Sequence, residues 1–545
     1  MTARRRDIGR TLAAMFRPRL QRPTVVALAA VAVVACTGQS SSGVSSPTSA
    51  VDGSPAPQST SVADATSPAT SQPSSDVVDE PVPADEPQFV PEQIEWTEFN
   101  DDVDVATLEV PVDYDDPAGP RFELFLARHR ALDPDARIGT IVVNPGGPGR
   151  AGVDYAIAAA HVYDAELLQR FDIVAWDPRG TGESTPTIDC IDDYDPYFTA
   201  VDSTPANDAE HDAIIATARA FTEACIARNG DILDSVGTNN SARDIDSIRR
   251  ALGEEILSYF GFSYGSELGA TWATLFPETV RAAVLDGGTD PAAGALESSI
   301  QQSRGFEAAL NTFFQRCAAD ESCAFGHNGD PRAAYLDLLA ALATQPLVVD
   351  PDRPPVNRDV ATLATYQAMY ADTYWPALER ALASAQFGDG AGLLELHDGY
   401  YRRHRDGTYP NFLEAFQVIS CADVAERFTI DEADAQVPAL HEAAPTLIPA
   451  DSTGSYFCTF FPPAGDPRIE ITGQGAGPIV VIGTTGDPAT PLESTAALAE
   501  TLEDGRLVVV DADQHLGYGA NACINELVNR YLVDLEAPDD GTECG

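Results

Sequence analysis

The chain has 545 residues and a formal net charge of −51, which excludes nucleic acid as a partner and excludes electrostatic adhesion to anionic lipid. Every basic residue other than histidine is arginine, so lysine-based catalysis is excluded as well. A hydrophobic content of 44% is typical of a soluble globular protein, and the length is sufficient for a large core.

The N-terminus has the pattern of an export signal. Seven arginines precede the apolar run 24–35, which is too short to span a bilayer. The run ends in Val-Val-Ala-Cys, which resembles a bacterial lipobox and predicts lipidation of Cys36. We therefore expect residues 1–36 to be a lipoprotein-type signal that leaves the protein exported and anchored to the outer face of the membrane only through its lipid. An ordinary secretory signal, and hence a secreted protein, is the alternative.

The next segment and the cysteines also fit an exported protein. Residues 37–91 are rich in Ser, Thr, Pro and Ala and predict a disordered tether. Eight cysteines follow, an even number that predicts disulfides, and no Cys-x-x-Cys pair or His/Cys cluster indicates a metal. Pairing between neighbours is the expected connectivity: Cys190 with Cys225, Cys317 with Cys323, Cys421 with Cys458, and Cys523 with Cys544.

From residue 107 onward, strand and helix patterns alternate, which predicts an α/β sheet. The expected strand 139–143 leads into Asn-Pro-Gly-Gly-Pro-Gly, which lacks the lysine of a phosphate-binding P-loop. The backbone N–H groups of such a loop suit a developing oxyanion, and a plain turn is the alternative. The expected strand 171–176 leads into Asp-Pro-Arg-Gly-Thr-Gly-Glu-Ser, for which we expect a structural role at the rim of the site.

The next strand pattern points to a nucleophile. The apolar run 256–260, the pentapeptide Gly-Phe-Ser-Tyr-Gly and a helix of small residues that ends before Pro277 follow one another directly. A strand, a tight turn and a helix in this order lift a serine hydroxyl clear of a sheet. We therefore predict that Ser263 is a nucleophile, with a buried structural turn as the alternative.

The pattern changes between residues 292 and 466, where helical periodicity dominates and buried strands are missing. We expect this segment to be a helical cap inserted into the sheet domain. The insertion divides the core into an N-terminal part, 92–291, and a C-terminal part, 467–545, in which strand patterns resume.

A serine nucleophile needs a base, and the base needs an acid to orient it. In α/β-hydrolases the chain order is serine, acid and then histidine, on loops after later strands. Of the eight histidines, His515 follows a late strand. Asp487, after the apolar run 479–482, is the preferred acid; Asp511 and Asp513 are competitors.

These motifs together resemble the α/β-hydrolase-fold tripeptidyl and prolyl aminopeptidase family of actinobacterial exported serine peptidases. N-P-G-G-P-G, F-D-I-V-A-W-D-P-R-G-T-G-E-S, G-F-S-Y-G, G-D-P-A-T-P and the late histidine are similar to its hallmarks in order and spacing, over residues 105–544. The resemblance implies a mostly parallel central sheet flanked by helices, with Ser263, Asp487 and His515 as the triad. It also implies an oxyanion hole formed by the backbone N–H groups of Gly147 and Tyr264.

Two positions depart from the family pattern. Arg150 begins the sequence Arg-Ala-Gly where Gly-Gly-Ser-Gly is common, and it could narrow the site or pair with a substrate carboxylate. Leu516 separates the histidine from a glycine that commonly follows it at once. Both departures bear on specificity rather than on the triad.

The resemblance implies an aminopeptidase that acts on peptides with free N-termini and needs no cofactor or metal. Asp423 is a candidate for holding the α-ammonium group of such a substrate. An exported carboxylesterase or lipase would use the same triad on an ester substrate. A lipid-anchored binding protein without activity is a third reading, and the sequence carries no signal for an oligomeric state.

Overall fold

The computed structural model describes residues 89–326 and 329–545. The expected export signal, Cys36 and nearly all of the expected tether lie outside these described residues. None of the helices in the described ranges combines the length and the apolar character that a membrane crossing requires.

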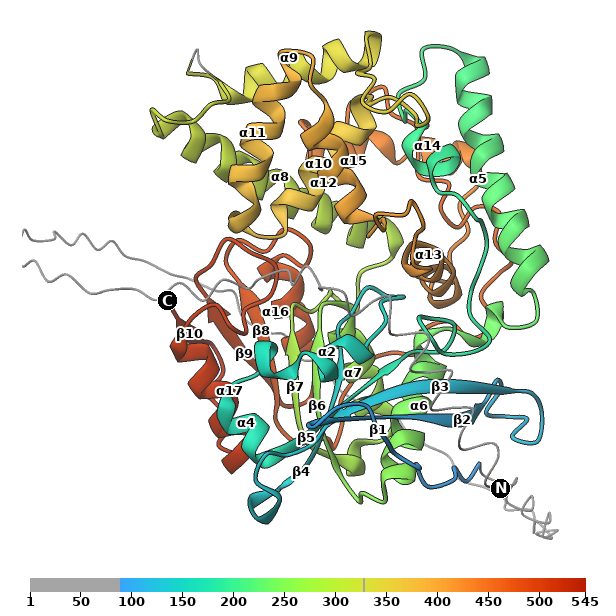
Figure 1. Cartoon of the computed structure of the whole chain (residues 1–545), viewed down its shortest axis with the longest axis vertical. Coiled ribbons are helices and arrows are strands. Elements are labelled where there is room, and N and C mark those ends of the chain that lie inside the picture. The colour runs from blue at the N-terminus through green and yellow to red at the C-terminus, as the bar shows by residue number, and fades with distance from the viewer. Residues whose placement is uncertain (1–88, 327–328) are drawn as a thin grey trace, which may run out of the picture. The chain divides into compact units, whose positions relative to one another are not determined.

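A ten-stranded sheet organises the structure, in the order β1-β2-β3-β5-β4-β6-β7-β8-β9-β10 (Figure 1). Its first pairs are antiparallel: β1 (Thr97–Glu98), β2 (Val103–Pro111), β3 (Arg121–His129) and β5 (Phe171–Asp177). The remaining pairs are parallel and add β4 (Gly139–Asn144), β6 (Leu257–Phe262), β7 (Val280–Asp286), β8 (Ile479–Thr484), β9 (Gly505–Val510) and β10 (Thr542–Cys544). The predicted α/β fold with a mostly parallel central sheet is confirmed.

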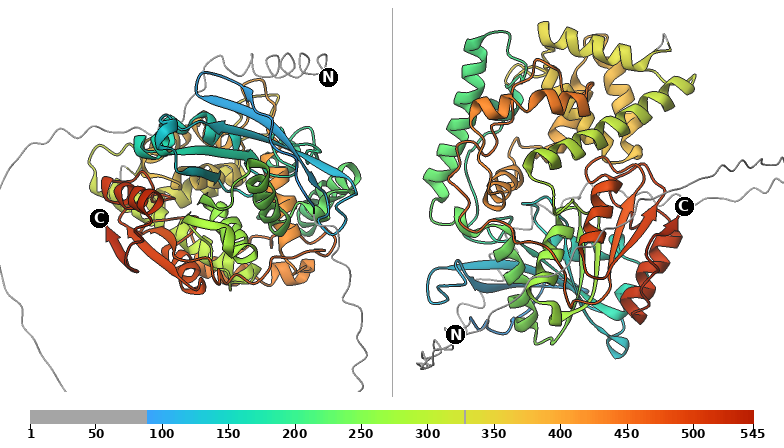
Figure 2. Two further views of the ribbon diagram at one scale, coloured as in Figure 1. Left: turned by 90° about the horizontal axis from the view of Figure 1, so that it is seen from below. Right: turned by 180° about the vertical axis from the view of Figure 1, so that it is seen from behind.

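Helices lie on both sides of this sheet (Figure 2). The helices that contact it are α2 (Val153–Ile157), α4 (Ala165–Arg170), α6 (Thr238–Leu252), α7 (Tyr264–Leu275), α16 (Leu492–Thr501) and α17 (Ala522–Asp534). Because both faces are covered, β4, β6 and β8 are buried at every position, and their sequences are nearly continuous apolar runs.

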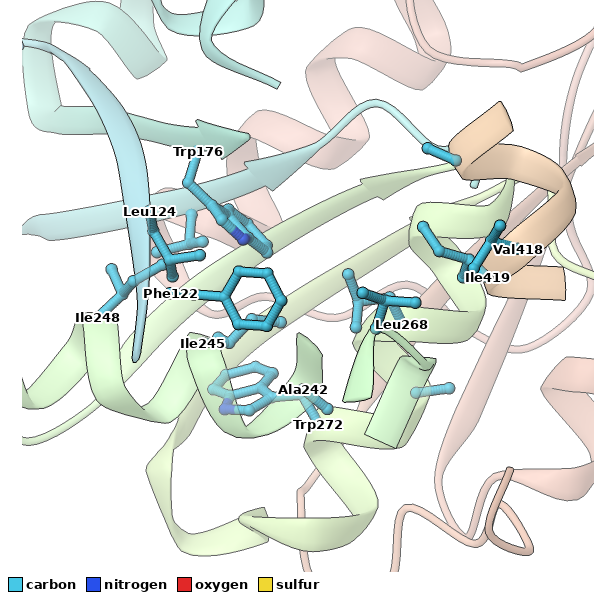
Figure 3. Packing of buried hydrophobic residues seen from close by; sticks show 14 of the residues in the cluster. Phe122, Leu124, Trp176, Ala242, Ile245, Ile248, Leu268, Trp272, Val418 and Ile419 are labelled. Atoms are coloured by element: carbon cyan, nitrogen blue, oxygen red, sulfur yellow. The ribbon is translucent and has the colours of Figure 1, made fainter. Parts of the chain in front are cut away.

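Large aromatic side chains fill the space between the sheet and α6 and α7 (Figure 3). Phe122 and Trp176 come from the strands, and Trp272 comes from α7; all three are fully buried. Truncating a buried aromatic side chain of this kind to alanine typically costs about 3–5 kcal/mol. The packing fixes α7, and with it the turn that carries Ser263, on the sheet.

Between β7 and β8 the chain forms a group of helices with its own hydrophobic core, drawn apart from the sheet in Figure 1. We call this group the inserted helices: α8 (Ala295–Ala319), α9 (Pro331–Thr344), α10 (Arg358–Met369), α11 (Trp375–Ala385), α12 (Ala391–Tyr400), α13 (Phe412–Asp423), α14 (Ile430–Asp434) and α15 (Val437–Ala443). The alanine-rich sequences of α10 and α11 allow these helices to pack closely against α12.

The segment after β5 also packs against the inserted helices, which the sequence analysis did not anticipate. Ser203 donates its backbone N–H to Asp359 in α10 at 2.7 Å. The carboxylate of Asp195 pairs with Arg353 at 2.8 Å, and both side chains are almost fully buried. The helix α5 (Asp208–Asn229) therefore belongs to the same layer as an insertion that begins far later in the chain.

Four cysteine pairs lie at disulfide distance, and they are the neighbour pairs expected from the sequence: Cys190–Cys225, Cys317–Cys323, Cys421–Cys458 and Cys523–Cys544. The first pair ties the segment after β5 to α5, and the third ties α13 to the chain that returns to the sheet. Disulfides that close loops of this kind typically stabilise a fold by about 2–4 kcal/mol.

Candidate active site

The turn between β6 and α7 holds Ser263 in a strained backbone conformation, with φ 56° and ψ −127°. A side chain at Gly265 would lie 2.5 Å from the carbonyl oxygen of Asn144, so glycine is required there. The backbone N–H of Ser263 donates to the carbonyl of Asp286 at 2.7 Å. Such strain costs about 1–3 kcal/mol and is concentrated at functional sites.

The predicted acid and base are in direct contact. His515 Nδ1 lies 2.9 Å from Asp487 Oδ2, and the Asp487 side chain is fully buried. Asp487 also accepts hydrogen bonds from the backbone N–H groups of Ala489 and Thr490 at 2.9 and 2.8 Å, which fix its orientation. The hydroxyl of Thr490 lies 3.1 Å from Asp487 Oδ2 and 3.3 Å from His515 Nδ1.

The other ring nitrogen of His515 is free. Nε2 is buried and has no hydrogen-bond partner among the described residues, so no hydrogen bond joins it to Ser263 Oγ in this state. The imidazole nevertheless lies beside the nucleophile turn, because a side chain at Gly287 would meet His515 Cε1 at 3.2 Å. Gly287 directly follows Asp286, whose carbonyl holds Ser263. All three predicted triad residues therefore follow the carboxyl ends of parallel strands, at one edge of the sheet.

The pKa of His515 is shifted by opposing effects. Burial lowers it, whereas the charge of Asp487, its hydrogen bond and the charge of Asp286 raise it. The net result is a pKa raised from the ordinary value of 6.5. A raised pKa is what a carboxylate beside an imidazole should produce, because it favours the imidazolium form.

Asp286 is a second buried carboxylate in the site, and sequence reasoning missed it. Its two oxygens accept the backbone N–H groups of Gly517 and Tyr518, each at 2.8 Å. Burial raises the pKa of Asp286 to about 6. The backbone carbonyl of Asp286 therefore holds the nucleophile turn, and its side chain holds the loop that carries His515. Its position at the end of a strand pattern was the only signal in the sequence.

The glycine-rich loop after β4 lies against the start of α7. A side chain at Gly146 would lie 2.9 Å from Ser263 Cβ and 3.1 Å from the backbone nitrogen of Tyr264. Gly147 has φ 119°, a conformation that glycine adopts readily. Within the described residues, the backbone N–H groups of Gly147 and Tyr264 donate no hydrogen bond. Both groups predicted to form an oxyanion hole are thus available beside Ser263.

Asp177, the last residue of β5 and the first residue of the charged turn motif, holds this glycine-rich loop in place. One of its oxygens accepts the backbone N–H groups of Gly152 and Val153 at 2.8 and 3.1 Å, and the other accepts that of Glu183 at 2.9 Å. Burial raises the pKa of Asp177 to about 6. Arg179 in the same turn is fully buried and pairs with Asp244 at 2.6 Å. These contacts fit the structural role expected for the turn.

The other candidate carboxylates are engaged elsewhere. Asp511 accepts a hydrogen bond from Thr485 at 2.9 Å, and Asp513 pairs with Arg316. Asp423, the last residue of α13, is buried, and its two oxygens accept hydrogen bonds from the backbone N–H and the hydroxyl of Thr238, each at 2.6 Å. Burial raises the pKa of Asp423 to about 7. We therefore do not assign Asp423 to a substrate α-ammonium group.

The inserted helices touch the site at two loops. A side chain at Gly149 would lie 2.5 Å from the backbone nitrogen of Phe416 in α13. On the other side, His515 donates its backbone N–H to the carbonyl of Tyr370 at 2.8 Å, and the two rings lie 5.6 Å apart. Neither contact had a signal in the sequence, because both join segments far apart in the chain.

Comparison with known proteins gives the class of this molecule. Residues 139–522 match the α/β hydrolase fold family, and the chain belongs to it. The protein is a serine hydrolase of this fold.

Three relatives show which members of this fold family the chain resembles. The chain is 35% identical to Serine protease Hip1 of Mycobacterium tuberculosis, over 80% of this chain and 86% of that protein. It is 35% identical to Carboxylesterase B of the same organism, over 81% of this chain and 86% of that protein. It is 30% identical to Tripeptidyl aminopeptidase of Streptomyces lividans, over 78% of this chain and 80% of that protein. The family resemblance inferred from the motifs is confirmed.

Proposed function

We propose that this protein is an exported aminopeptidase that releases short peptides from free N-termini. Ser263 is the nucleophile, His515 the base and Asp487 the acid. The observation that carries the proposal is the hydrogen bond from His515 Nδ1 to Asp487, which leaves Nε2 unpartnered beside the strained Ser263 turn. The relatives named as a serine protease and a tripeptidyl aminopeptidase support a peptide as the substrate.

The proposed reaction is acyl transfer. His515 takes the proton of Ser263 Oγ as that oxygen bonds to the scissile carbonyl carbon, and Asp487 stabilises the imidazolium that forms. The imidazolium then protonates the leaving amine as the C–N bond breaks. Water, activated by the same histidine, attacks the acyl-enzyme, and the proton returns to Ser263 as the peptide acid leaves.

The negative charge of the tetrahedral intermediate falls on the former carbonyl oxygen. We propose that the backbone N–H groups of Gly147 and Tyr264 donate to this oxygen. Each donor of this kind is worth on the order of 3 kcal/mol of transition-state stabilisation. Asp177 is then a positioning residue, since it fixes the far end of the glycine-rich loop.

A carboxylesterase is the second candidate. The chain is as similar to Carboxylesterase B as it is to the serine protease. An ester is also the easier substrate for the same residues, because an amide carbonyl is more strongly stabilised by resonance and an unprotonated amide nitrogen leaves less readily than an alkoxide. The two activities differ only in what the leaving group and the substrate N-terminus require of the site.

A substrate panel separates these candidates. It compares tripeptide anilides with a free amine, their N-acetylated forms, single prolyl anilides and short-chain nitrophenyl esters, with Ser263→Ala as the inactive control. We expect anilide hydrolysis only when the amine is free, and no hydrolysis by Ser263→Ala. Ester hydrolysis without anilide hydrolysis would identify an esterase. Unchanged hydrolysis by Ser263→Ala would show that Ser263 is not the nucleophile.

We also propose that Cys36 carries the lipid that retains the protein at the cell surface. The support is the lipobox pattern of the sequence alone. In a detergent phase separation, the native protein should enter the detergent phase and Cys36→Ser should stay in the aqueous phase. Mass spectrometry of the N-terminal peptide checks the modification directly.

A further inference from the structure

The loop that carries His515 is held from two sides. On the core side, the hydroxyl of Thr484, at the end of β8, donates to the carbonyl of the residue before His515 at 2.6 Å. On the other side, His515 donates its backbone N–H to the carbonyl of Tyr370 at 2.8 Å. Asp372 donates its backbone N–H to the carbonyl of Asp513 at 3.2 Å. A segment between two of the inserted helices therefore pairs with the His515 loop as a short antiparallel bridge.

One arginine of the inserted helices holds a carboxylate from each side of this bridge. Arg316, in α8, donates from Nη1 to Asp372 Oδ2 at 3.1 Å and pairs through Nη2 with Asp513. Its guanidinium lies over the ring of Trp375, 4.7 Å from the ring centroid. That ring is buried in the hydrophobic core of the inserted helices. The guanidinium is thus fixed by a buried ring and joins the two segments through their side chains.

The same helix also contacts the loop that carries Asp487. Gln302, in the first half of α8, donates from its side chain to the carbonyl of Ala489 at 3.0 Å. A side chain at Gly305 would lie 2.6 Å from the carbonyl oxygen of Pro488, so the backbone of the helix packs directly against this loop. The helix α8 therefore reaches the loop of the proposed acid with its first half and the loop of the proposed base near its C-terminal end.

The two carboxylates depend on Arg316 for their charge balance. Among the described residues, neither Asp372 nor Asp513 forms an ion pair with a second cation. Without the guanidinium, two negative charges on opposite sides of the bridge would repel each other. The side chains are 31 to 50% exposed, so these ion pairs contribute little to global stability. Their effect falls instead on the position of the loop that carries His515.

We propose that Arg316 is a positioning residue for the catalytic base, which holds the His515 loop at the distance from Asp487 that proton transfer requires. The proposal rests on the proposed function, in which His515 is the base. Arg316 acts through Asp513, two residues before the histidine, and needs no contact with the substrate. A displacement of a catalytic group on the order of 1 Å is enough to lower a reaction rate strongly.

The rate at which a fluorophosphonate labels Ser263 measures the base directly. Ser263 Oγ bonds to phosphorus, fluoride leaves and His515 takes the hydroxyl proton, so the probe works whether the natural substrate is a peptide or an ester. We expect Arg316→Gln to lower the second-order labelling rate by about tenfold. Arg316→Lys should lower it by about threefold, because lysine keeps the charge but not the planar fork. On any substrate that the wild-type protein hydrolyses, kcat should fall by similar factors and KM should stay within about twofold.

Arg304→Gln is the matched control. Arg304 lies in the same helix and pairs with a core carboxylate, Glu493, at 2.6 Å, and both side chains are 53% exposed, close to the 50% of Arg316. Its partner belongs to α16 and not to the His515 loop. The variant should keep the wild-type labelling rate within about twofold. Thermal unfolding of each variant checks that it is folded.

A second substitution separates positioning from a general loss of contacts. Asp372→Asn in the Arg316→Gln background removes one of the two charges that would repel. The double variant should therefore recover to within about threefold of the wild-type labelling rate. If Arg316 only stabilised the fold, the second substitution would remove a further contact and the losses would add.

The outcomes separate this proposal from the proposed function. An Arg316→Gln variant that is labelled as fast as the wild type would overturn the positioning role and leave the triad intact. Equal slowing in Arg316→Gln and Arg304→Gln, or additive losses in the double variant, would overturn the role as well. Slower labelling of Arg316→Gln in a protein that hydrolyses esters but no peptide would support the role and overturn the aminopeptidase. No labelling of Ser263 in the wild type would overturn both.

Discussion

The sheet core and the inserted helices make different contributions to the proposed site. In the core, the candidate catalytic residues follow strand ends, and a hydrogen bond to the buried carboxylate of Asp487 fixes the ring of His515. The inserted helices contribute backbone and ring contacts instead, such as those of Tyr370 and Phe416. The sheet therefore supplies the proposed catalytic groups, whereas the insertion contacts the loops that carry His515 and Gly149.

The largest effect should come from the core itself, through Asp487→Asn. Asparagine cannot stabilise the imidazolium and favours the wrong tautomer of His515, so kcat should fall by about 10⁴-fold. Asp511→Asn is the matched control, because Asp511 bonds to Thr485 and not to the histidine. It should stay within about twofold of wild type. Equal losses of kcat in the two variants would show that Asp487 is not the acid that orients His515.

Asp286→Asn tests a contact within the core that joins two loops. An amide offers one acceptor where two backbone N–H groups now donate, so the His515 loop should shift and kcat/KM should fall by about 10- to 100-fold. Circular dichroism and thermal unfolding check that the variant is folded.

The pH profile separates positioning by Asp286 from a merely structural role. An imidazolium cannot act as a base, so activity should fall as the pH drops through the pKa of His515, which lies above 6.5. The charge of Asp286 helps to raise that pKa, so Asp286→Asn should move the acid limb of kcat/KM to lower pH. A purely structural residue would lower the whole profile and leave the limb in place.

The core was largely predictable from the sequence. Expected strands at 139–143, 171–176 and 256–260 correspond to β4, β5 and β6 within two residues at each end. Strands buried on both faces read as apolar runs, and the turns after them carry glycines that no other residue could replace. Ser263, Asp487 and His515 could be chosen because each candidate follows such a run.

The contacts of the inserted helices with the core, and the hydrogen bonds that join loops far apart in the chain, were not predictable from the sequence. Asp286 holds a backbone N–H of Gly517, which lies 231 residues further along the chain. The N–H group of Tyr518 beside it is held in the same way, and neither has a side-chain signal in the sequence. Likewise, helical periodicity predicted an inserted helical region over 292–466, but not that Phe416 of α13 in that region would contact Gly149. A pattern of local periodicity contains no information on which distant surfaces meet.

Gly149→Ala tests the contact between the two regions. The added methyl group would lie 2.5 Å from the backbone of α13, so the glycine-rich loop or the helix must move, and kcat/KM should fall by about tenfold. Gly388→Ala is the matched control, because Gly388 has a similar φ, 92° against 84°, but open space around its Cα. Both variants should lose about 1 kcal/mol of stability from backbone strain. Equal activities in the two would show that α13 does not constrain the loop.

The smallest effect should come from Leu516→Gly. This variant tests whether the leucine after the histidine, where the family commonly has a glycine, matters for activity. Leu516 has φ 80°, a left-handed conformation that costs a leucine about 1–2 kcal/mol and that glycine adopts freely. The backbone therefore keeps the shape that a glycine would give, and kcat should stay within about threefold of wild type.

Leu535→Gly is the matched control for stability. Leu535 also has a positive φ, 60°, but it directly follows α17 and is 51% exposed, so the substitution relieves strain and removes little packing. Leu516 packs against Gly287, and losing that contact should offset the relief. In denaturant unfolding we expect Leu535→Gly to be slightly more stable than wild type and Leu516→Gly to lie within about 1 kcal/mol of it. A tenfold change in kcat for Leu516→Gly would instead mean that the leucine side chain, and not the backbone that it distorts, determines the position of His515.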